Sequence, residues 1–240
     1  MTLLAESAGA ALRLLLEGNR YVLETVLLSL RVSGLALLLG TAIGLPVGAA
    51  LGMTRFRGRS LLVALVHTGF ALPPVVVGLF VYMMLSRSGP AGSLEILFTP
   101  AAMVIAQAIL AAPYIAGISL AAIQAVPVEV RLQALALGAS PARAVFTHLR
   151  EARLGIGAAV VGGFGAVISE VGAVMMVGGN IAGETRVMTT AIMLETRRGN
   201  FATAMALGII LLLLAFLVNA ILTAAQQGRG AVAAAGRRAW

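Results

Sequence analysis

Hydrophobic and polar positions along this chain are segregated into long blocks rather than alternating residue by residue. A helix crosses the hydrocarbon core of a membrane with about 20 apolar residues, whereas a β-barrel strand needs about 10 alternating ones. The apolar blocks are long and do not alternate, which favours helices. The pattern predicts an all-α membrane protein with five transmembrane helices, over residues 27 to 52, 60 to 85, 100 to 125, 155 to 179 and 202 to 225.

The composition agrees with this prediction and excludes several kinds of chemistry. Hydrophobic residues make up 60% of the chain and charged residues 11%, whereas soluble domains have about 25% charged residues. The chain has no Cys, Lys or Asp. A phosphate-binding P-loop needs Lys, a Ser/His/Asp triad needs Asp, and two His cannot form a metal cluster. We therefore expect no cofactor, no metal and no covalent catalysis in this chain.

The net charge of +8 comes from Arg alone, and its distribution predicts an orientation rather than nucleic-acid binding. Arginines gather after the first span, after the third span and in the tail, namely Arg55, Arg57, Arg59, Arg131, Arg143, Arg150, Arg153, Arg229, Arg237 and Arg238. The positive-inside rule places these segments in the cytoplasm and the N-terminus outside. We expect an extracytoplasmic or interfacial segment at 1 to 24 with a helix at 3 to 20, a transmembrane domain at 25 to 225 and a cytoplasmic tail at 226 to 240.

Glycine and proline mark the spans in two ways. Gly40, Gly44, Gly48 and Gly52 follow one another at four-residue spacing. Such a stripe lets a second helix approach closely, either within the chain or from another subunit. Four prolines fall inside predicted spans, where they bend helices; they are Pro46, Pro73, Pro74 and Pro113. They indicate either a moving pathway or only the higher frequency of Pro in membrane helices.

The longest polar stretch, residues 129 to 155, predicts two short helices outside the membrane. The first ends at Gly138, and Ser140 with Pro141 starts the second, which is amphipathic. The stretch is either a solvated loop whose Arg residues set the topology or a docking site for a soluble partner.

The residues "ALALGAS", Ala134 to Ser140, about ten residues before "HLREA", resemble the EAA loop of permease subunits in binding-protein-dependent ABC importers. Ala134 and Gly138 match the signature, whereas Leu132 replaces its usual Glu and Glu151 a frequent Pro. The resemblance implies a type I importer (MetI-like) transmembrane domain whose coupling loop, residues 127 to 154, docks in a cytoplasmic ATPase dimer. The implied coupling residues are Ala134, Gly138, Ala139, Ser140 and Arg143.

The resemblance extends over most of residues 25 to 225. "ALPPVVVGL" and "AAPYIAGI" resemble core helices of the molybdate, sulfate and tungstate permeases, and "ISEVGAVMMVGGNIAGETRVMTTAIMLE" is similar to the tungstate branch. It implies oxyanion import, most of all of tungstate, with molybdate or sulfate as alternatives. It also implies ATP and Mg²⁺ on the ATPase, an extracytoplasmic binding protein, a second copy of the chain and a place in the inner membrane.

Glu170 is an ionisable residue inside the fourth predicted span, which makes it a functional candidate. A carboxylate would repel an oxyanion, so we expect it to hold a gate or helix packing by hydrogen bonds, with Arg31 as a possible ion-pair partner or as an interfacial residue. A different class of protein, an ATP-independent carrier, would use Glu170 for proton coupling.

An oxyanion needs hydrogen-bond donors along its path. The candidates are Ser169, Asn180, Thr189 and Thr190, with Arg186 at the outer mouth. Val75, Val76 and Val77 either form an apolar gate or face lipid.

Overall fold

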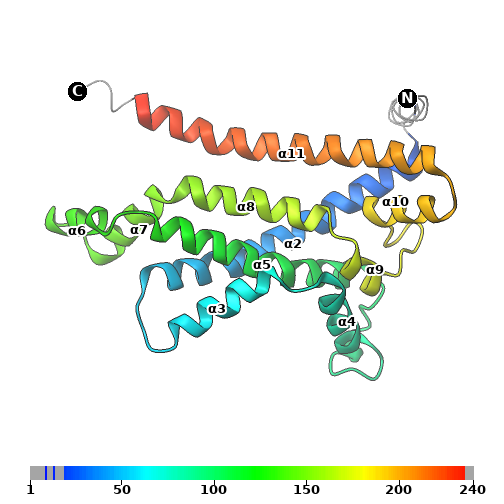
Figure 1. The fold of residues 1–240 in the computed structure, drawn as a ribbon, viewed down its shortest axis with the longest axis horizontal. Coiled ribbons are helices and arrows are strands. Elements are labelled where there is room, and N and C mark those ends of the chain that lie inside the picture. Colours follow the sequence, from blue (N-terminus) through cyan, green and yellow to red (C-terminus); the bar gives the residue numbers. More distant parts are fainter. Residues whose placement is uncertain (1–8, 10–12, 14–18, 236–240) are drawn as a thin grey trace.

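The fold is known from a computed structural model, which describes residues 9, 13 and 19–235, with side chains up to residue 224. The elements within 19–235 are all helical, as predicted (Figure 1). They are α2 (Arg20–Met53), α3 (Arg59–Phe70), α4 (Pro74–Leu85), a 3₁₀ turn (Gly92–Leu94), α5 (Pro100–Gln124), α6 (Val128–Ala136), α7 (Pro141–Glu151), α8 (Arg153–Ile168), α9 (Gly172–Gly178), α10 (Met188–Arg197) and α11 (Phe201–Ala235).

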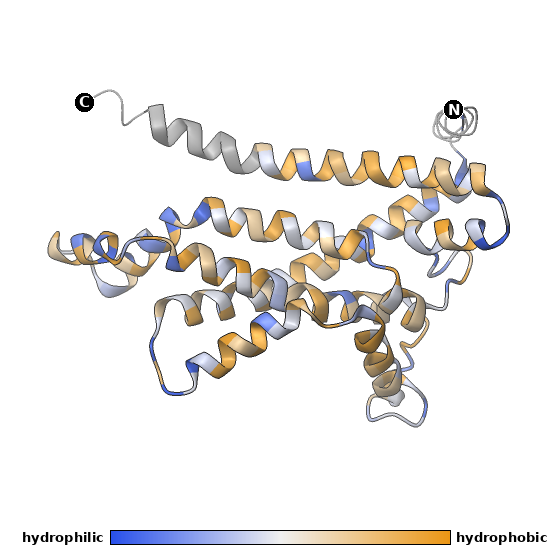
Figure 2. Cartoon of the chain, in the orientation of Figure 1, coloured by the Kyte–Doolittle hydropathy of each residue, from blue (hydrophilic) through white to orange (hydrophobic). Residues whose placement is uncertain are grey.

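Three of the described helices, α2, α5 and α11, are long and apolar enough to cross a membrane, and up to five spans result if each of two bent pairs counts as one. The pairs are α3 with α4 and α7 with α8. The long helices run along one axis, with α6 and α7 at one end and α10 at the other (Figure 1). Apolar residues dominate the helices between these ends (Figure 2).

The second predicted span is broken sharply rather than gently kinked. The α3 helix ends at Phe70, α4 begins at Pro74, and the two axes differ by 101°. Two adjacent prolines explain the break, because each lacks an N–H donor and each disfavours helical geometry in the residue before it. Pro74 then suits the first position of α4. Pro46 and Pro113, by contrast, lie inside continuous helices.

The prediction of one helix over residues 155 to 179 is wrong. The α8 helix ends at Ile168, and the seven-residue α9 begins at Gly172 after a break. The segment 180 to 201, which connects the fourth and fifth predicted spans, contains α10. The predicted interfacial helix at 3 to 20 falls mostly outside the described residues, and α2 already begins at Arg20, where the Asn19 side chain accepts hydrogen bonds from the first free amides.

The glycine stripe packs α2 against α5 within the chain. A Cβ on Gly40 would lie 2.6 Å from the Cβ of Ala111, and one on Gly44 or Gly48 would overlap a backbone carbonyl oxygen of α5. These contacts support the intramolecular alternative for the stripe, because the two backbones approach too closely for any side chain.

Candidate functional site

The break between α8 and α9 is formed around the carboxylate of Glu170, which is 7% exposed. Oε1 accepts a hydrogen bond from the amide of Ala173 at 2.8 Å, and Oε2 accepts one from the amide of Val174 at 3.0 Å. These amides belong to the first turn of α9 and have no acceptor within that helix. Glu170 therefore caps α9, with its negative charge at the positive end of the short helix.

Arg31 does not pair with Glu170. No ion pair joins them among the described residues, and Arg31 is exposed on α2, beside a cavity that Tyr21, Glu24 and Arg186 also line. The expectation that hydrogen bonds hold Glu170 therefore agrees with the geometry, but backbone amides supply them rather than an arginine.

Three further side chains fix the backbone of the break. The hydroxyl of Thr189 donates to the carbonyl oxygen of Glu170 at 2.9 Å, and that of Ser169 donates to the carbonyl oxygen of Gly165 at 2.8 Å. The buried amide of Gln107 on α5 donates to the carbonyl oxygen of Val167 at 2.9 Å. Our sequence reasoning missed Gln107, although a lone amide in an apolar span was the available signal.

The α9 helix packs against α4, which contains the predicted gate. Val77 is buried in the core cluster that also contains Ala173 and Val174, whereas Val75 and Val76 are each 55% exposed. A Cβ on Gly172 would lie 2.7 Å from a methyl group of Val75. The structure thus brings Val75, Val77 and Glu170 together around α9.

Asn180 and Thr190 lie apart from this group, in and after the connection from α9 to α10. The side-chain oxygen and the carbonyl oxygen of Asn180 each accept a hydrogen bond from Arg186 at 3.1 Å. The hydroxyl of Thr190 accepts a hydrogen bond from the amide of Val187 at 3.1 Å and donates one to the carbonyl oxygen of Val187 at 3.0 Å, which caps the start of α10. Both polar groups therefore already have protein partners in this conformation.

Met188 at the start of α10 is joined to α2. Its amide donates to the buried hydroxyl of Ser29 at 2.8 Å. Ser29 is another residue that the sequence did not single out, because a lone Ser in an apolar helix usually bonds only to its own helix.

The polar stretch forms the predicted pair of helices, α6 and α7. Gly138 has a φ of +85°, the left-handed conformation that suits glycine after a helix, and the amide of Ala139 donates to the carbonyl oxygen of Ala134 at 3.0 Å. The hydroxyl of Ser140 accepts from the amide of Arg143 at 3.4 Å and caps α7. Arg143 itself is exposed.

Apolar side chains are exposed on this pair of helices. Leu137, at the tip beside Gly138, is 88% exposed, Leu132 is 55% exposed and Phe146 is 65% exposed. The buried face of α7 consists instead of Ala144 and His148. Exposed apolar groups on a polar segment are typical of a protein interaction surface.

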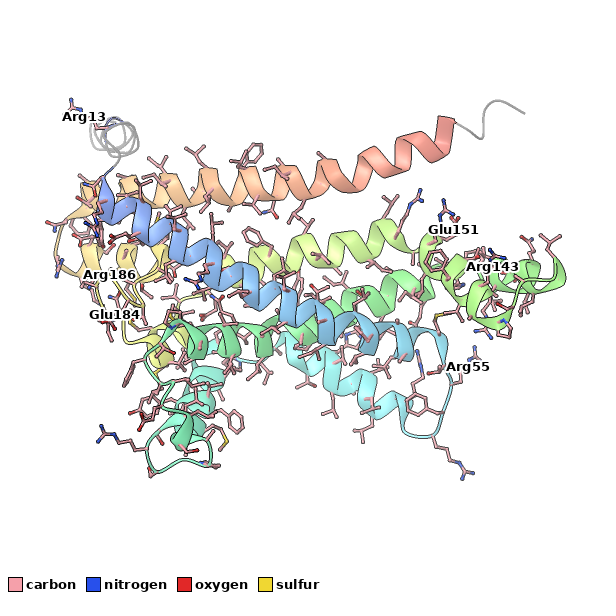
Figure 3. The ribbon with its side chains drawn as sticks, turned by 180° about the vertical axis from the view of Figure 1, so that it is seen from behind. Arg13, Arg55, Arg143, Glu151, Glu184 and Arg186 are labelled. Carbon is pink, nitrogen blue, oxygen red and sulfur yellow. The ribbon has the colours of Figure 1, made fainter. Side chains whose placement is uncertain are left out.

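The labelled charged residues lie at two opposite ends of the molecule. Arg55, Arg143 and Glu151 lie at the end that contains α6 and α7, and Glu184 and Arg186 lie at the other (Figure 3). The two ends are joined by the apolar helices, as the sequence predicts for a chain whose charged connections lie on both sides of a membrane.

Comparison with known proteins identifies the family. Residues 44–229 match the family of binding-protein-dependent transport system inner membrane components. The chain belongs to this family. It is an ABC transporter permease, a multi-pass membrane subunit and not an enzyme, and permeases of this kind work with a separate ATPase and a substrate-binding protein.

Curated relatives of the permease include transporters of anions. A probable anion ABC transporter permease of Haloferax volcanii is 44% identical over 88% of this chain and 95% of its own length. The tungstate uptake permease TupB of Peptoclostridium acidaminophilum is 37% identical over 95% of this chain and 100% of its own length. The molybdenum permease ModB of Escherichia coli is 31% identical over 75% of this chain and 83% of its own length.

Solved structures confirm the predicted MetI-like fold of the permease. An inward-facing form of the MetNI methionine transporter matches with a TM-score of 0.73 at 20% identity, over 88% of this chain and 96% of that one. A transporter of the polysaccharide alginate matches with a TM-score of 0.70 at 20% identity, over 85% of this chain and 78% of that one.

Proposed function

We propose that this permease imports tungstate. The observation that supports the proposal is the 37% identity to TupB, which extends over the whole length of that protein. A second TupB, from Campylobacter jejuni, is 36% identical over 88% of both chains, whereas ModB is 31% identical in Escherichia coli and 30% in Azotobacter vinelandii. Molybdate and sulfate are the alternative cargoes within the same function.

The path of the oxyanion passes the α4–α9 region. A dianion is held by donors that also release it, such as hydroxyls and amides, and not by a deep ion pair. Ser169 is an exposed hydroxyl next to the break, and Asn180, Thr189 and Thr190 supply polar groups on the segment that follows. Val75, Val76 and Val77 form the apolar gate, which α9 positions through its contact with Val75.

Glu170 is a structural residue in this proposal. Its carboxylate would repel a dianion, and both of its oxygens accept backbone amides. The carrier alternative assigns Glu170 a proton-coupling role, and no contact among the described residues supports that role.

The α6–α7 pair couples the permease to the ATPase. The apolar tip at Leu137 and the small residues Ala134, Gly138 and Ala139 enter a groove of the ATPase, with Ser140 and Arg143 at the start of the second helix. ATP and Mg²⁺ bind to the ATPase dimer and not to this chain. Two copies of the permease form the pathway, with the N-terminus and the binding protein outside and the C-terminus in the cytoplasm.

The test of the cargo is uptake by proteoliposomes that contain the permease and its ATPase, with the binding protein added on the outside. We expect ATP-dependent uptake of tungstate that excess sulfate does not suppress. Equal competition by sulfate would overturn the assignment to tungstate, and uptake that needs no ATP but follows a proton gradient would overturn the ABC mechanism for this chain.

The test of the coupling surface is co-purification of the ATPase with a Leu137→Asp variant. Because Leu137 is 88% exposed, its replacement leaves the fold unchanged and places a charge in the docking groove. We expect loss of the ATPase from this variant but not from the matched Leu94→Asp, which alters a Leu that is 60% exposed in the 3₁₀ turn Gly92–Leu94, outside the coupling loop. Equal retention of the ATPase by both variants would contradict the docking role.

A further inference from the structure

A basic cavity of about 440 Å³ lies where the α2–α3 connection meets α5, α6 and α7. Its lining includes Arg55 and Arg59 from the connection and α3, Arg131 from α6 and His148 from α7, and no carboxylate. Arg55 and Arg131 are 76 residues apart in the sequence, and both line this one cavity. Like charges in a shared cavity repel one another unless an anion lies between them.

The described residues offer the side chains that line this cavity few partners. Arg55 and Arg131 make no hydrogen bond or ion pair within the described part of the chain. Arg59 donates one N–H to the carbonyl oxygen of Leu51 at 2.8 Å, which holds the guanidinium beside the cavity. His148 donates from Nε2 to the carbonyl oxygen of Ile123 at 3.0 Å, while its Nδ1 is buried without a partner. The lining is suited to an anionic group, because guanidinium forks match the oxygens of a phosphate.

An apolar groove of about 530 Å³ adjoins the basic cavity between α2, α3 and α5. Consecutive residues at the end of α2 line the two spaces, Leu51 the groove and Gly52 the cavity. Along α2 the groove runs from Ile43 to Leu51, which corresponds to about 12 Å at 1.5 Å per residue. One leaflet of a bilayer contributes about 15 Å of hydrocarbon, so the groove has the length of a lipid chain segment within that leaflet.

The groove is open to its surroundings. Val47 is 40% exposed, Leu62 44% and Leu65 57%, and all three line it. In a multi-pass membrane protein these side chains lie at the depth of the hydrocarbon, whereas the arginines follow directly after the end of the helix, at the level of the headgroups. The arginines and the apolar groove therefore follow one another along the membrane normal as the anionic headgroup and the acyl chain of a phospholipid do.

We propose that the cavity and the groove together bind one anionic phospholipid, with its phosphate between Arg55, Arg59 and Arg131 and one acyl chain along the groove. Basic pockets between transmembrane helices recognise anionic headgroups in this way. The bound lipid joins the α2–α3 connection to α6 of the coupling loop. The positive-inside rule alone does not require this convergence, since Arg57 in the same connection satisfies the rule without lining the cavity.

The first experiment compares two variants of equal charge. Arg55→Gln/Arg131→Gln removes two lining arginines that have no partner in the described chain, and Arg57→Gln/Arg150→Gln removes two exposed arginines from the same two connections that do not line the cavity. The full-length chain, freed of lipid in a neutral detergent, is titrated with phosphatidylglycerol or phosphatidylcholine and the bound lipid is counted by native mass spectrometry.

We expect one molecule of phosphatidylglycerol to bind to the parent and to the control variant, and binding about 25-fold weaker to the lining variant, because each of the two arginines near an anionic lipid contributes about five-fold. Phosphatidylcholine, whose own cation offsets its phosphate, binds more weakly to all three. Equal binding of the two lipids, or equal loss in both variants, overturns the proposal.

The second experiment separates a lipid from a free anion and from a protein partner. Val47→Trp fills the groove without touching the arginines, and Leu38→Trp, which changes an α2 residue that is 66% exposed and outside the groove, is the control. We expect only Val47→Trp to weaken phosphatidylglycerol binding. Full displacement of the lipid by millimolar inorganic phosphate or tungstate would instead indicate a free-oxyanion site. Loss of the lipid when two copies of the chain associate would indicate that the groove is a subunit contact.

Discussion

Glu170 makes no ion pair among the described residues. Its two carboxylate oxygens instead accept hydrogen bonds from the amides of Ala173 and Val174 in the first turn of α9. A carboxylate inside a continuous helix would find every nearby amide already bonded to a carbonyl oxygen four residues earlier. The helix must therefore end before Glu170 for this side chain to be satisfied, and a new one must begin after it. The break in the fourth span therefore provides the hydrogen bonds that a carboxylate buried at this depth needs.

Removing this cap tests the explanation. We expect Glu170→Ala to lower the free energy of unfolding by about 1–3 kcal/mol, because two buried amides lose their acceptor. Glu170→Gln has an intermediate effect, since one of its atoms still accepts a hydrogen bond and the other is a donor that faces a donor. Circular dichroism during thermal unfolding of the purified chain in detergent measures both.

Glu184→Gln is the control, because Glu184 is exposed. If Glu170→Gln were as stable as the parent but abolished uptake driven by a proton gradient, Glu170 would be a proton-coupling residue and not a cap.

The same residue shows where sequence reasoning reached its limit. Hydropathy predicts the apolar stretch from 155 to 179 but not the break inside it, because neither Ser169 nor Val171 forbids a helix. The sequence did place Gly138 and Ser140 correctly at the junction of α6 and α7, because a left-handed glycine and a hydroxyl cap act through their immediate neighbours. The contact of Gln107 with Val167 joins residues 60 positions apart and depends on how the helices pack, which periodicity does not encode.

The helix pair α2–α5 depends on the absence of side chains along one stripe. Gly44 faces the carbonyl oxygen of Ala112, and a methyl group there would push the helices apart. Gly34, ten residues earlier on the same helix, has no heavy atom within 4 Å of the position of its missing Cβ. Both glycines lie in the interior of the same helix but only Gly44 makes this contact, so comparing them separates close packing from helix propensity.

We expect Gly44→Ala to destabilise the permease by about 1–3 kcal/mol through overpacking. Gly34→Ala has no such clash and gains up to about 1 kcal/mol from the better helix propensity of Ala. Chemical unfolding of the two variants in detergent distinguishes them. An equal effect of both substitutions would show that helix propensity, and not the approach of α5, determines the role of Gly44.

In the proposed mechanism the two ends of the molecule have different roles, because one end docks the ATPase and the other faces the binding protein. The end with α6 and α7 bears Arg55 and Arg143, and the other end bears Glu184 and Arg186 (Figure 3). Force from an ATPase can reach the α4–α9 region only if the first end is cytoplasmic. The lipid cavity lies at that same end, beside α6, so the orientation also decides which leaflet supplies its occupant.

The orientation can be measured directly because the chain has no cysteine of its own. Glu184→Cys and Arg57→Cys each introduce one thiol at an exposed position. A membrane-impermeant maleimide added to intact cells should label Glu184→Cys and leave Arg57→Cys unlabelled, because the positive-inside rule places the arginine-rich connections in the cytoplasm. Labelling of both variants after the membrane is permeabilised is the control for reactivity. The reverse pattern in intact cells would place α6 and α7 outside, where no ATPase acts, and would refute the coupling role of Leu137 together with the N-out topology.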